Sequence, residues 1–154
     1  MLPVRIRLTL QNKTMIEKSP FNLLQEIYYP DAWKILVVCM FLNQTGRKQV
    51  DMVRDEFFEK YPTASKCVMA DYDEMVKILT PMGFQNKRSS AIIRMSREYM
   101  NMKWEKASDL YGIGKYANDS YEIFINHNFD VEPEDHVLNK YLPWRKSQEF
   151  RKNI

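Results

Sequence analysis

The run from Ala32 to Leu42 constrains the fold of this chain more than any other stretch. All of its residues except Lys34 are apolar, so a helix formed here would be apolar on nearly every face. Such a helix has to lie inside a protein with other elements packed around it. A chain of 154 residues is long enough to enclose that core and suits one domain. The sequence therefore predicts a domain built around a buried helix at 32–42.

The remaining apolar residues recur mostly at helical spacing, and no stretch of 19–154 has the alternating pattern of a strand. Val50, Val53 and Phe57, for example, mark one face of a helix that ends before Pro62. The pattern predicts an all-α domain of about eight to ten helices. Further helices are expected at about 63–69, 72–79, 85–102 and from 135 onward, fading into a polar, basic end at 145–154.

Ser19 and Pro20 have the chemistry of a helix N-cap and first helical residue, and apolar residues follow at helical spacing. Residues 1–18 are basic, and 4–10 alternates between apolar and other residues. This alternation would suit a short strand, but no later segment offers a partner strand. We therefore expect a flexible basic leader at 1–18 and one domain at 19–154.

Net charge, the length of apolar stretches and cysteine content limit the classes of protein to which this chain can belong. The formal net charge of +3 permits a nucleic-acid partner without requiring one. No apolar stretch reaches the roughly 18–20 residues of a membrane span, so no membrane association is expected. Cys39 lies in the apolar run and indicates a core thiol. The two cysteines give neither a disulfide framework nor the ligands of an iron–sulfur cluster.

Gly112 and Gly114 flank a single apolar residue directly before a helical run. This spacing suits a tight turn between two helices, because glycine adopts positive φ without strain and lets the backbone approach another group closely. The unpaired N–H groups at the start of the next helix, together with its dipole, attract anions such as a DNA phosphate. An ordinary interhelical turn would explain the two glycines equally well.

Asp135 follows Pro133 and Glu134 and precedes the apolar pattern of the last helix, so we expect it at the helix start. A carboxylate there is favoured in its charged form, because it caps N–H groups at the positive end of the dipole. The residues alone favour a plain N-cap over a catalytic group. His127 and His136 lack the companions of a metal site, so no metal is expected.

Short phrases spread from Ser19 to Trp144 carry a family resemblance, in this order: Ser19-Pro-Phe-Asn-Leu-Leu-Gln-Glu26, Trp33-Lys-Ile-Leu36, Phe41-Leu-Asn-Gln-Thr45, Glu59-Lys-Tyr-Pro62, Leu110-Tyr-Gly-Ile-Gly-Lys-Tyr116, Asn118-Asp-Ser-Tyr121, Pro133-Glu-Asp-His136 and Leu138-Asn-Lys-Tyr141. They resemble the helix-hairpin-helix DNA glycosylase superfamily. Within it, they are most similar to the glycosylase domain of the methyl-CpG-binding-domain thymine glycosylase family.

The resemblance implies a helix-hairpin-helix glycosylase fold and a mismatch-directed enzyme of base excision repair, which removes thymine or uracil opposite guanine. Some members of the superfamily hold an iron–sulfur cluster, which two cysteines cannot ligate, so no cofactor is expected. The implied partners are double-stranded DNA with a G·T or G·U mismatch and downstream abasic-site repair enzymes. The implied state is a monomer that acts in the nucleus.

By this resemblance Asp135 is the catalytic aspartate, since the family's aspartate lies in the same Pro-Glu-Asp-His phrase. Base excision breaks the bond between sugar and base through a positively charged sugar, which a nearby carboxylate stabilises. Tyr116 would line the base pocket. Gln25 would hydrogen-bond the edge of the extruded pyrimidine, because an amide both donates and accepts. A packed tyrosine and an exposed helix glutamine are the alternatives.

The position of Lys115 bears on whether the glycosylase is monofunctional or bifunctional. Bifunctional relatives place a lysine amine two residues after the second glycine, where it forms a Schiff base with the sugar, but position 116 here is a tyrosine. One residue along a helix is a rotation of about 100°, so the Lys115 amine is expected to point away from the pocket and to meet a phosphate. The resemblance therefore implies a monofunctional glycosylase that leaves an abasic site.

Phe84 stands where the family has an apolar residue that enters the space left by the base, although a core phenylalanine would also fit the sequence. Gln44 replaces a phosphate-binding arginine, for which Arg47 or Lys48 could compensate, and Val137 replaces a lysine. Lys140, Arg145 and Lys146 are further basic candidates. The expected DNA contacts are Gly112, Gly114, Lys115, Phe84, Gln44, Arg47, Lys87 and Arg88.

Two rival functions stay open from the sequence. A non-catalytic DNA-binding module would keep the phosphate contacts of the hairpin and lack excision. A glycosylase for an oxidised or alkylated base would keep the chemistry and bind a different target.

Overall fold

The computed structural model describes residues 16–152, and this part of the chain is all-α, as predicted, with no strand. The expected leader at 1–18 and its alternating stretch lie almost wholly outside the described residues. The helices are α2 (Leu24–Tyr28), α3 (Ala32–Leu42), α4 (Arg47–Lys60), α5 (Ala64–Val68), α6 (Tyr72–Leu79), η1 (Thr80–Met82), α7 (Gln85–Asn101), η2 (Ala107–Asp109), α8 (Lys115–Phe124) and α9 (His136–Lys152).

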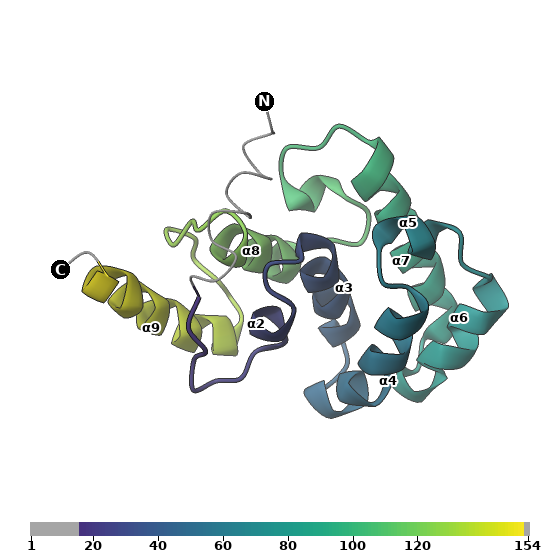
Figure 1. Cartoon of the computed structure of the whole chain (residues 1–154), viewed down its shortest axis with the longest axis horizontal. Helices are drawn as coiled ribbons and strands as arrows, with labels where there is room; N and C mark the ends of the chain where they lie inside the picture. The colour runs from purple at the N-terminus through teal and green to yellow at the C-terminus, as the bar shows by residue number, and fades with distance from the viewer. Residues whose placement is uncertain (1–15, 153–154) are drawn as a thin grey trace.

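Helix α3 is the centre of the fold and contacts α2, α4, α7 and α8 (Figure 1). Ile35, Val38 and Phe41 of this helix are fully buried, and Cys39 is a buried free thiol as expected. The apolar run at 32–42 is therefore the buried central helix that the sequence predicts, with the same bounds. In Figure 1, α8 and α9 lie to the left of α3, and α4 to α7 lie to its right.

Three helices begin where a capping side chain precedes the apolar pattern. Asp31, Thr63 and Asp71 each accept a hydrogen bond from the N–H three residues further on, at 3.0–3.1 Å. These bonds satisfy donors that have no partner within the first helical turn. Local chemistry thus explains the starts of α3, α5 and α6.

The first helix of the domain starts later than the sequence predicts. Ser19 is not an N-cap, because its N–H and hydroxyl donate to the Glu26 carboxylate at 2.6 and 2.8 Å. The same carboxylate accepts from the Leu23 N–H at 2.8 Å, so α2 begins at the next residue. Asn22 has a φ of 52°, a left-handed conformation that interrupts any helix begun at Pro20.

Helix α9 continues to Lys152 and does not fade at Arg145. Tyr141 stacks on Phe124 of α8, with ring centres 4.8 Å apart. Arg145 is buried, and it donates to the Tyr141 hydroxyl at 3.1 Å and to the Glu149 carboxylate at 2.9 Å. Arg145 therefore belongs to the packing of α9, and the phosphate contact suggested by its charge is not supported.

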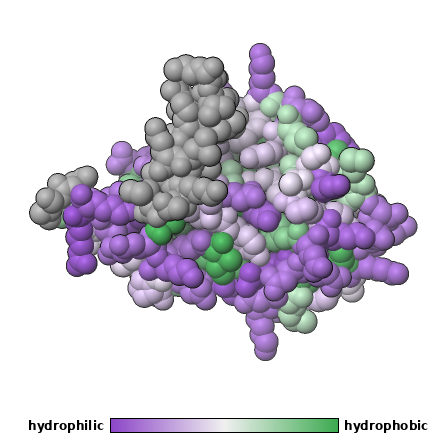
Figure 2. All heavy atoms as spheres, in the orientation of Figure 1, coloured by the Kyte–Doolittle hydropathy of each residue, from purple (hydrophilic) through white to green (hydrophobic). Residues whose placement is uncertain are grey.

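The surface is mostly polar. Figure 2 shows hydrophilic side chains over much of the face seen in Figure 1, with smaller hydrophobic areas between them. Within residues 16–152, no helix combines the length and the apolar character needed to cross a membrane.

Candidate active site

A cavity of about 720 Å³ opens where the end of α3, the start of α8 and the start of α9 meet. Its wall also includes residues 21–25 and the loop after α3. Most of the site residues predicted from the sequence line this cavity, namely Asp135, Tyr116, Gln25, Gly112, Gly114, Lys115, Gln44 and Arg47. Phe84, Lys87 and Arg88 line a second cavity beside it.

Asp135 is both a helix cap and part of the cavity wall. Its Oδ2 accepts from the N–H groups of Val137 at 3.0 Å and Leu138 at 2.9 Å. The carboxylate therefore lies at the positive end of the α9 dipole. Because both bonds use Oδ2 and the residue is only partly buried, Oδ1 is available to a water or a substrate. Capping and catalysis are thus compatible roles for this side chain.

The hairpin presents bare backbone to the cavity. Gly112 has a φ of 76°, and a Cβ there would lie 2.9 Å from the terminal methyl group of Met40. Gly114 has ordinary φ, and a Cβ there would meet nothing within 4 Å. Neither backbone strain nor a close neighbour requires a glycine at position 114. The missing side chain leaves open space at the start of α8. An anion could approach the unpaired N–H groups of this helix there.

Gln25 is fully buried, so the alternative of an exposed helix glutamine is wrong. Its Nε2 donates to the Tyr116 hydroxyl at 2.9 Å and to the Ser120 hydroxyl at 3.0 Å. Its Oε1 is buried without a hydrogen-bond partner among the described residues, and the side chain lines the cavity. An unpaired buried acceptor costs about 1–3 kcal/mol, so this oxygen is suited to a donor that a ligand brings.

The cavity wall around Gln25 is polar but uncharged. Burial raises the pKa of the Tyr116 phenol well above its ordinary value and raises the pKa of the Cys39 thiol to about 12. Both groups are therefore neutral at neutral pH. The Tyr116 hydroxyl accepts from Gln25 and keeps its own proton for a second bond. Such a wall suits a neutral ligand edge with both donors and acceptors.

Phe84 lies directly before α7 with a φ of 51° and is 62% exposed, so the alternative of a core phenylalanine is wrong. A left-handed conformation is strained for a bulky residue and persists where the surroundings enforce it. The second cavity, of about 450 Å³, lies beside this ring and shares Met40, Gln44 and Gly112 with the first. The structure thus presents an exposed aromatic ring at a cavity that adjoins the first.

Arg88 enforces this conformation, and its place differs from the predicted phosphate contact. The residue is only 9% exposed. Its guanidinium donates to the Gly83 carbonyl at 2.9 Å, to the Phe41 carbonyl at 3.0 Å and to the Thr45 hydroxyl. These bonds tie the turn before α7 to the end of α3. Protein acceptors therefore occupy the N–H donors of Arg88. The side chain holds the turn that carries Phe84 and does not serve as the predicted phosphate contact.

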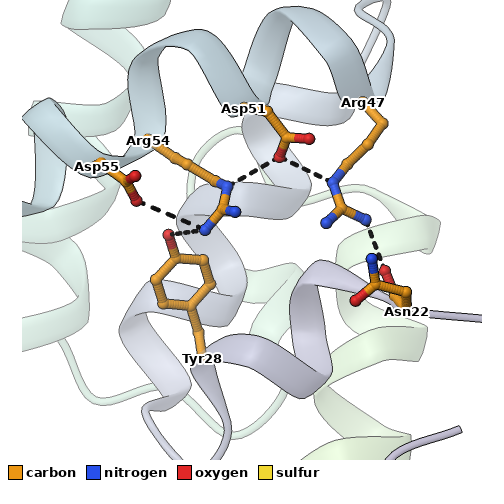
Figure 3. Close-up of polar contacts among 6 residues, drawn as sticks. All are labelled: Asn22, Tyr28, Arg47, Asp51, Arg54 and Asp55. Atoms are coloured by element: carbon orange, nitrogen blue, oxygen red, sulfur yellow. Dashed lines mark hydrogen bonds and ion pairs between the residues drawn. The ribbon is translucent and has the colours of Figure 1, made fainter.

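Arg47 closes one edge of the first cavity. Its Nη1 donates to the Asn22 carbonyl at 2.6 Å and its Nε to Asp51 at 2.9 Å, and Figure 3 shows the guanidinium between these partners. Asp51 also accepts from Arg54 at 2.8 Å, which joins the two arginines of α4 through one carboxylate. Gln44 is exposed, has a φ of 63° and lines both cavities. Arg47 thus supplies positive charge at the cavity where Gln44 has none.

The two lysines predicted at the DNA differ in their surroundings. Lys115 lines the first cavity, but its Nζ donates to Asp119 Oδ2 at 2.9 Å and to the Glu132 carbonyl at 2.8 Å. Lys87 is exposed at the second cavity. The expected phosphate contact at Lys115 is thus occupied by protein groups, whereas Lys87 stays a candidate for such a contact.

Sequence reasoning missed Asp119 and Ser120, two buried polar residues of α8. Each lies four residues after a functional side chain of the same helix, Lys115 and Tyr116. This helical spacing is the signal that could have found them, because side chains four residues apart share a face. In the described range 16–152, no group of His, Cys, Asp and Glu is arranged to hold a metal ion.

The chain is similar to known proteins in both sequence and structure. Residues 37–150 match the sequence model described as HhH-GPD superfamily base excision DNA repair protein. The chain is 40% identical over 139 residues to a methyl-CpG-binding domain protein 4-like protein of Arabidopsis thaliana, a match over 90% of this chain and 31% of the relative. It is 29% identical over 93 residues to a thymine-DNA glycosylase of Aeropyrum pernix, over 56% of this chain and 42% of the relative.

Among solved structures, a thermostable thymine-DNA glycosylase matches with a TM-score of 0.61, over 80% of this chain and 58% of that chain. At 20% sequence identity, this likeness shows a shared fold. The chain spans less than half the length of the curated relatives it matches.

Proposed function

Because the chain belongs to the HhH-GPD superfamily of base excision DNA repair proteins, we propose that it is a monofunctional DNA glycosylase that removes thymine or uracil opposite guanine. One observation carries the proposal: a single cavity holds the Asp135 carboxylate together with the uncharged pair of Gln25 and Tyr116. Relatives named as thymine-DNA glycosylase and thymine/uracil-DNA glycosylase support the substrate class.

The cavity would receive a base that has left the DNA stack. Its volume of about 720 Å³ is within the range of small-molecule sites. Thymine and uracil carry an N–H donor at N3, which would meet the unpaired Oε1 of Gln25. Cytosine has an acceptor at that position and would leave the oxygen unpaired. The Tyr116 hydroxyl can donate to an exocyclic oxygen of the same base.

Asp135 would act on the sugar. When the bond between C1′ and the base nitrogen breaks, its electron pair leaves with the base and the sugar becomes an oxocarbenium-like cation. The carboxylate stabilises this cation electrostatically. Its Oδ1 orients the water that adds to C1′ and accepts the proton that the water loses. Asp135 then releases this proton to solvent and the departed base anion takes one up, so the products are the free base and an abasic site.

Among the described residues that line this cavity, no amine is free for strand cleavage. Position 116 is a tyrosine, and the Lys115 amine is bonded to Asp119 and Glu132. The hydrogen bond with Asp119 raises the pKa of this amine, so it stays protonated and cannot attack the sugar. We therefore expect borohydride to trap no covalent protein–DNA adduct. A trapped adduct would contradict the monofunctional assignment.

Labelled duplexes that carry G·T, G·U, oxidised or alkylated bases, followed by alkali, test the function. Cleavage at G·T and G·U supports the proposal, with A·T and A·U duplexes as controls for dependence on the mismatch. Cleavage only at the other lesions would assign a different target base. Gel retardation without any cleavage would assign a DNA-binding module instead.

A further inference from the structure

Lys115 is the first residue of α8 and directly follows Gly114 of the hairpin. Its Nζ donates to Asp119 Oδ2 at 2.9 Å and to the Glu132 carbonyl at 2.8 Å. Asp119 belongs to α8, whereas Glu132 belongs to the segment that leads to Asp135. One side chain therefore connects the hairpin to the segment that carries the proposed catalytic carboxylate.

Near its end this segment packs on the core through Val131, and among the described residues the side chains that donate to its backbone there are Lys115 and Asn139. Residues 125–135 join α8 to α9 without regular secondary structure. Asn139 donates to the Pro133 carbonyl at 2.8 Å, but Asn139 is part of α9 and would move with it. The bond from Lys115 reaches the segment from α8. It therefore fixes the segment relative to the hairpin and not only relative to α9.

The charges around Lys115 favour a fixed position for its amine. The side chain of Asp119 is 7% exposed, and that of Lys115 is 46% exposed. A buried carboxylate is costly without a cation, so Asp119 acts as the anchor for the amine. Besides Asp119, both Glu132 and Glu134 favour the protonated amine and raise its pKa. This negative charge offsets the attraction of the amine for a DNA phosphate.

We propose that Lys115 is a positioning residue that sets the distance between the hairpin, which holds the DNA backbone, and the Asp135 carboxylate, which acts on the sugar. This inference rests on the proposed function. A misplacement of about 1 Å can lower a rate by about 100-fold even when every reacting group is present. Lys115 thus acts on the rate through Asp135 and not on the affinity through a phosphate.

Lys115→Met keeps the aliphatic stem and removes the amine, and Lys115→Arg restores a charged donor. We expect Lys115→Met to lower the single-turnover rate on a G·T duplex by roughly 10- to 100-fold, with Lys115→Arg in between. DNA binding is measured with the same changes in an Asp135→Asn background, where the duplex stays intact. The Kd and its salt dependence are expected to stay unchanged there, because no phosphate contact is lost.

Asp119→Asn distinguishes positioning of Asp135 from binding of a phosphate, because the first role predicts a lower rate and the second predicts tighter DNA binding. If Lys115 positions Asp135, loss of the anchor lowers the rate, as in Lys115→Met. If Asp119 instead holds the amine back from a phosphate, its release tightens DNA binding and steepens the salt dependence by about 0.9 in slope. Tighter binding in Asp119→Asn would overturn the proposal. Weaker binding with a shallower slope in Lys115→Met would also overturn it.

Amide hydrogen exchange tests the contact without any need for activity. We expect Lys115→Met and Asp119→Asn to speed exchange across 130–138, which includes the N–H groups bonded to Asp135, and to leave 64–79 unchanged. Lys60→Met is the matched control, because it removes a lysine ion pair, with Glu74 at 3.4 Å, between α4 and α6. It should keep wild-type exchange and rate.

The outcomes distinguish this proposal from the proposed function. Unchanged exchange at 130–138 in both site variants would overturn the role of Lys115, whatever the activity. Faster exchange there together with a slower single-turnover rate supports it. A wild-type chain that excises no base from any duplex would refute the proposed function, and exchange alone would then decide whether Lys115 holds the segment.

Discussion

Two loops at the rims of the cavities are each held by one basic side chain, but in opposite ways. Arg88 holds the turn that carries Phe84, and its guanidinium is buried and donates to three backbone carbonyls and a hydroxyl. Lys115 holds the segment that carries Asp135, and its half-exposed side chain bonds to one carboxylate and one carbonyl. The first contact is built into the core, and the second lies at the surface.

This difference affects what each loop loses when its basic side chain is removed. Loss of Arg88 would leave the Phe41 carbonyl without its donor in a buried place, and an unpaired buried group costs about 1–3 kcal/mol. Loss of Lys115 would leave a Glu132 carbonyl that water can reach, and it would take the cation away from the buried Asp119 carboxylate. The Phe84 turn is therefore held from within the folded core, whereas the Asp135 segment is held by a half-exposed amine whose buried partner is Asp119.

The largest effect is expected on the Asp135 side. Asp135→Asn keeps an oxygen that can accept from Val137 and Leu138 but removes the charge. Excision at G·T should fall by about 10³-fold, the upper range for loss of one electrostatic stabiliser, while fold and mismatch binding are kept. Single-turnover assays measure this, with Glu134→Gln as the control beside it. Full activity in Asp135→Asn would remove the catalytic assignment.

The next effect concerns stability on the Phe84 side. Arg88→Met should lower the free energy of unfolding by about 2–3 kcal/mol, because buried acceptors lose a charged donor. Denaturant unfolding measures this, and Arg97→Met, an exposed position on the same helix, is the control. The comparison between the two loops would fail if Arg88→Met were as stable as Arg97→Met.

A smaller effect is expected from the exposed ring itself. Phe84→Ala should leave stability unchanged and lower excision of a mismatched thymine by about 10-fold, because nothing then fills the space left by the base. Fluorescence of 2-aminopurine beside the mismatch reports base extrusion. Phe150→Ala is the control, since that phenylalanine is also exposed, at 68%. Equal losses on a mismatched and on an already unpaired thymine would contradict a role in extrusion.

The smallest effect is a gain in affinity. Gln44→Arg adds a cation at a position that lines both cavities. DNA binding should tighten several-fold at low salt, and the slope of the salt dependence should rise by about 0.9 for one added phosphate contact. Binding titrations at several salt concentrations measure this. Asn101→Arg, at the far end of α7, is the control for added charge alone, and an equal gain there would argue against a specific contact at Gln44.

Helices marked by neighbouring sequence patterns could be predicted from the sequence. The helix at 32–42 has its predicted bounds because the apolar pattern and the Asp31 cap lie next to each other in the chain. The place of Asp135 at the start of α9 follows from the same kind of signal. The predicted helix start, with Ser19 as N-cap and Pro20 as first helical residue, is wrong, because Ser19 instead donates to the carboxylate of Glu26, seven residues later.

The basic residues show why their contacts in the site could not be predicted from local sequence patterns. Positive charge predicts that a side chain needs acceptors, but not whether water, a phosphate or the protein supplies them. Arg88 finds the carbonyl of Phe41, which lies 47 residues earlier in the chain. A backbone carbonyl is present at every position, so the sequence holds no signal for this pairing. The same holds for Lys115 and the Glu132 carbonyl.

The sequence by itself determined the all-α class, the central helix, the glycine hairpin and the capping place of Asp135. Only the tertiary structure decided that Gln25 is buried with an unpaired oxygen, that Phe84 is exposed and that Arg88 is enclosed. The reason is that burial and hydrogen-bond partners depend on how distant segments pack. Gln25 and Tyr116 meet across 91 residues of chain, and no local pattern encodes that contact.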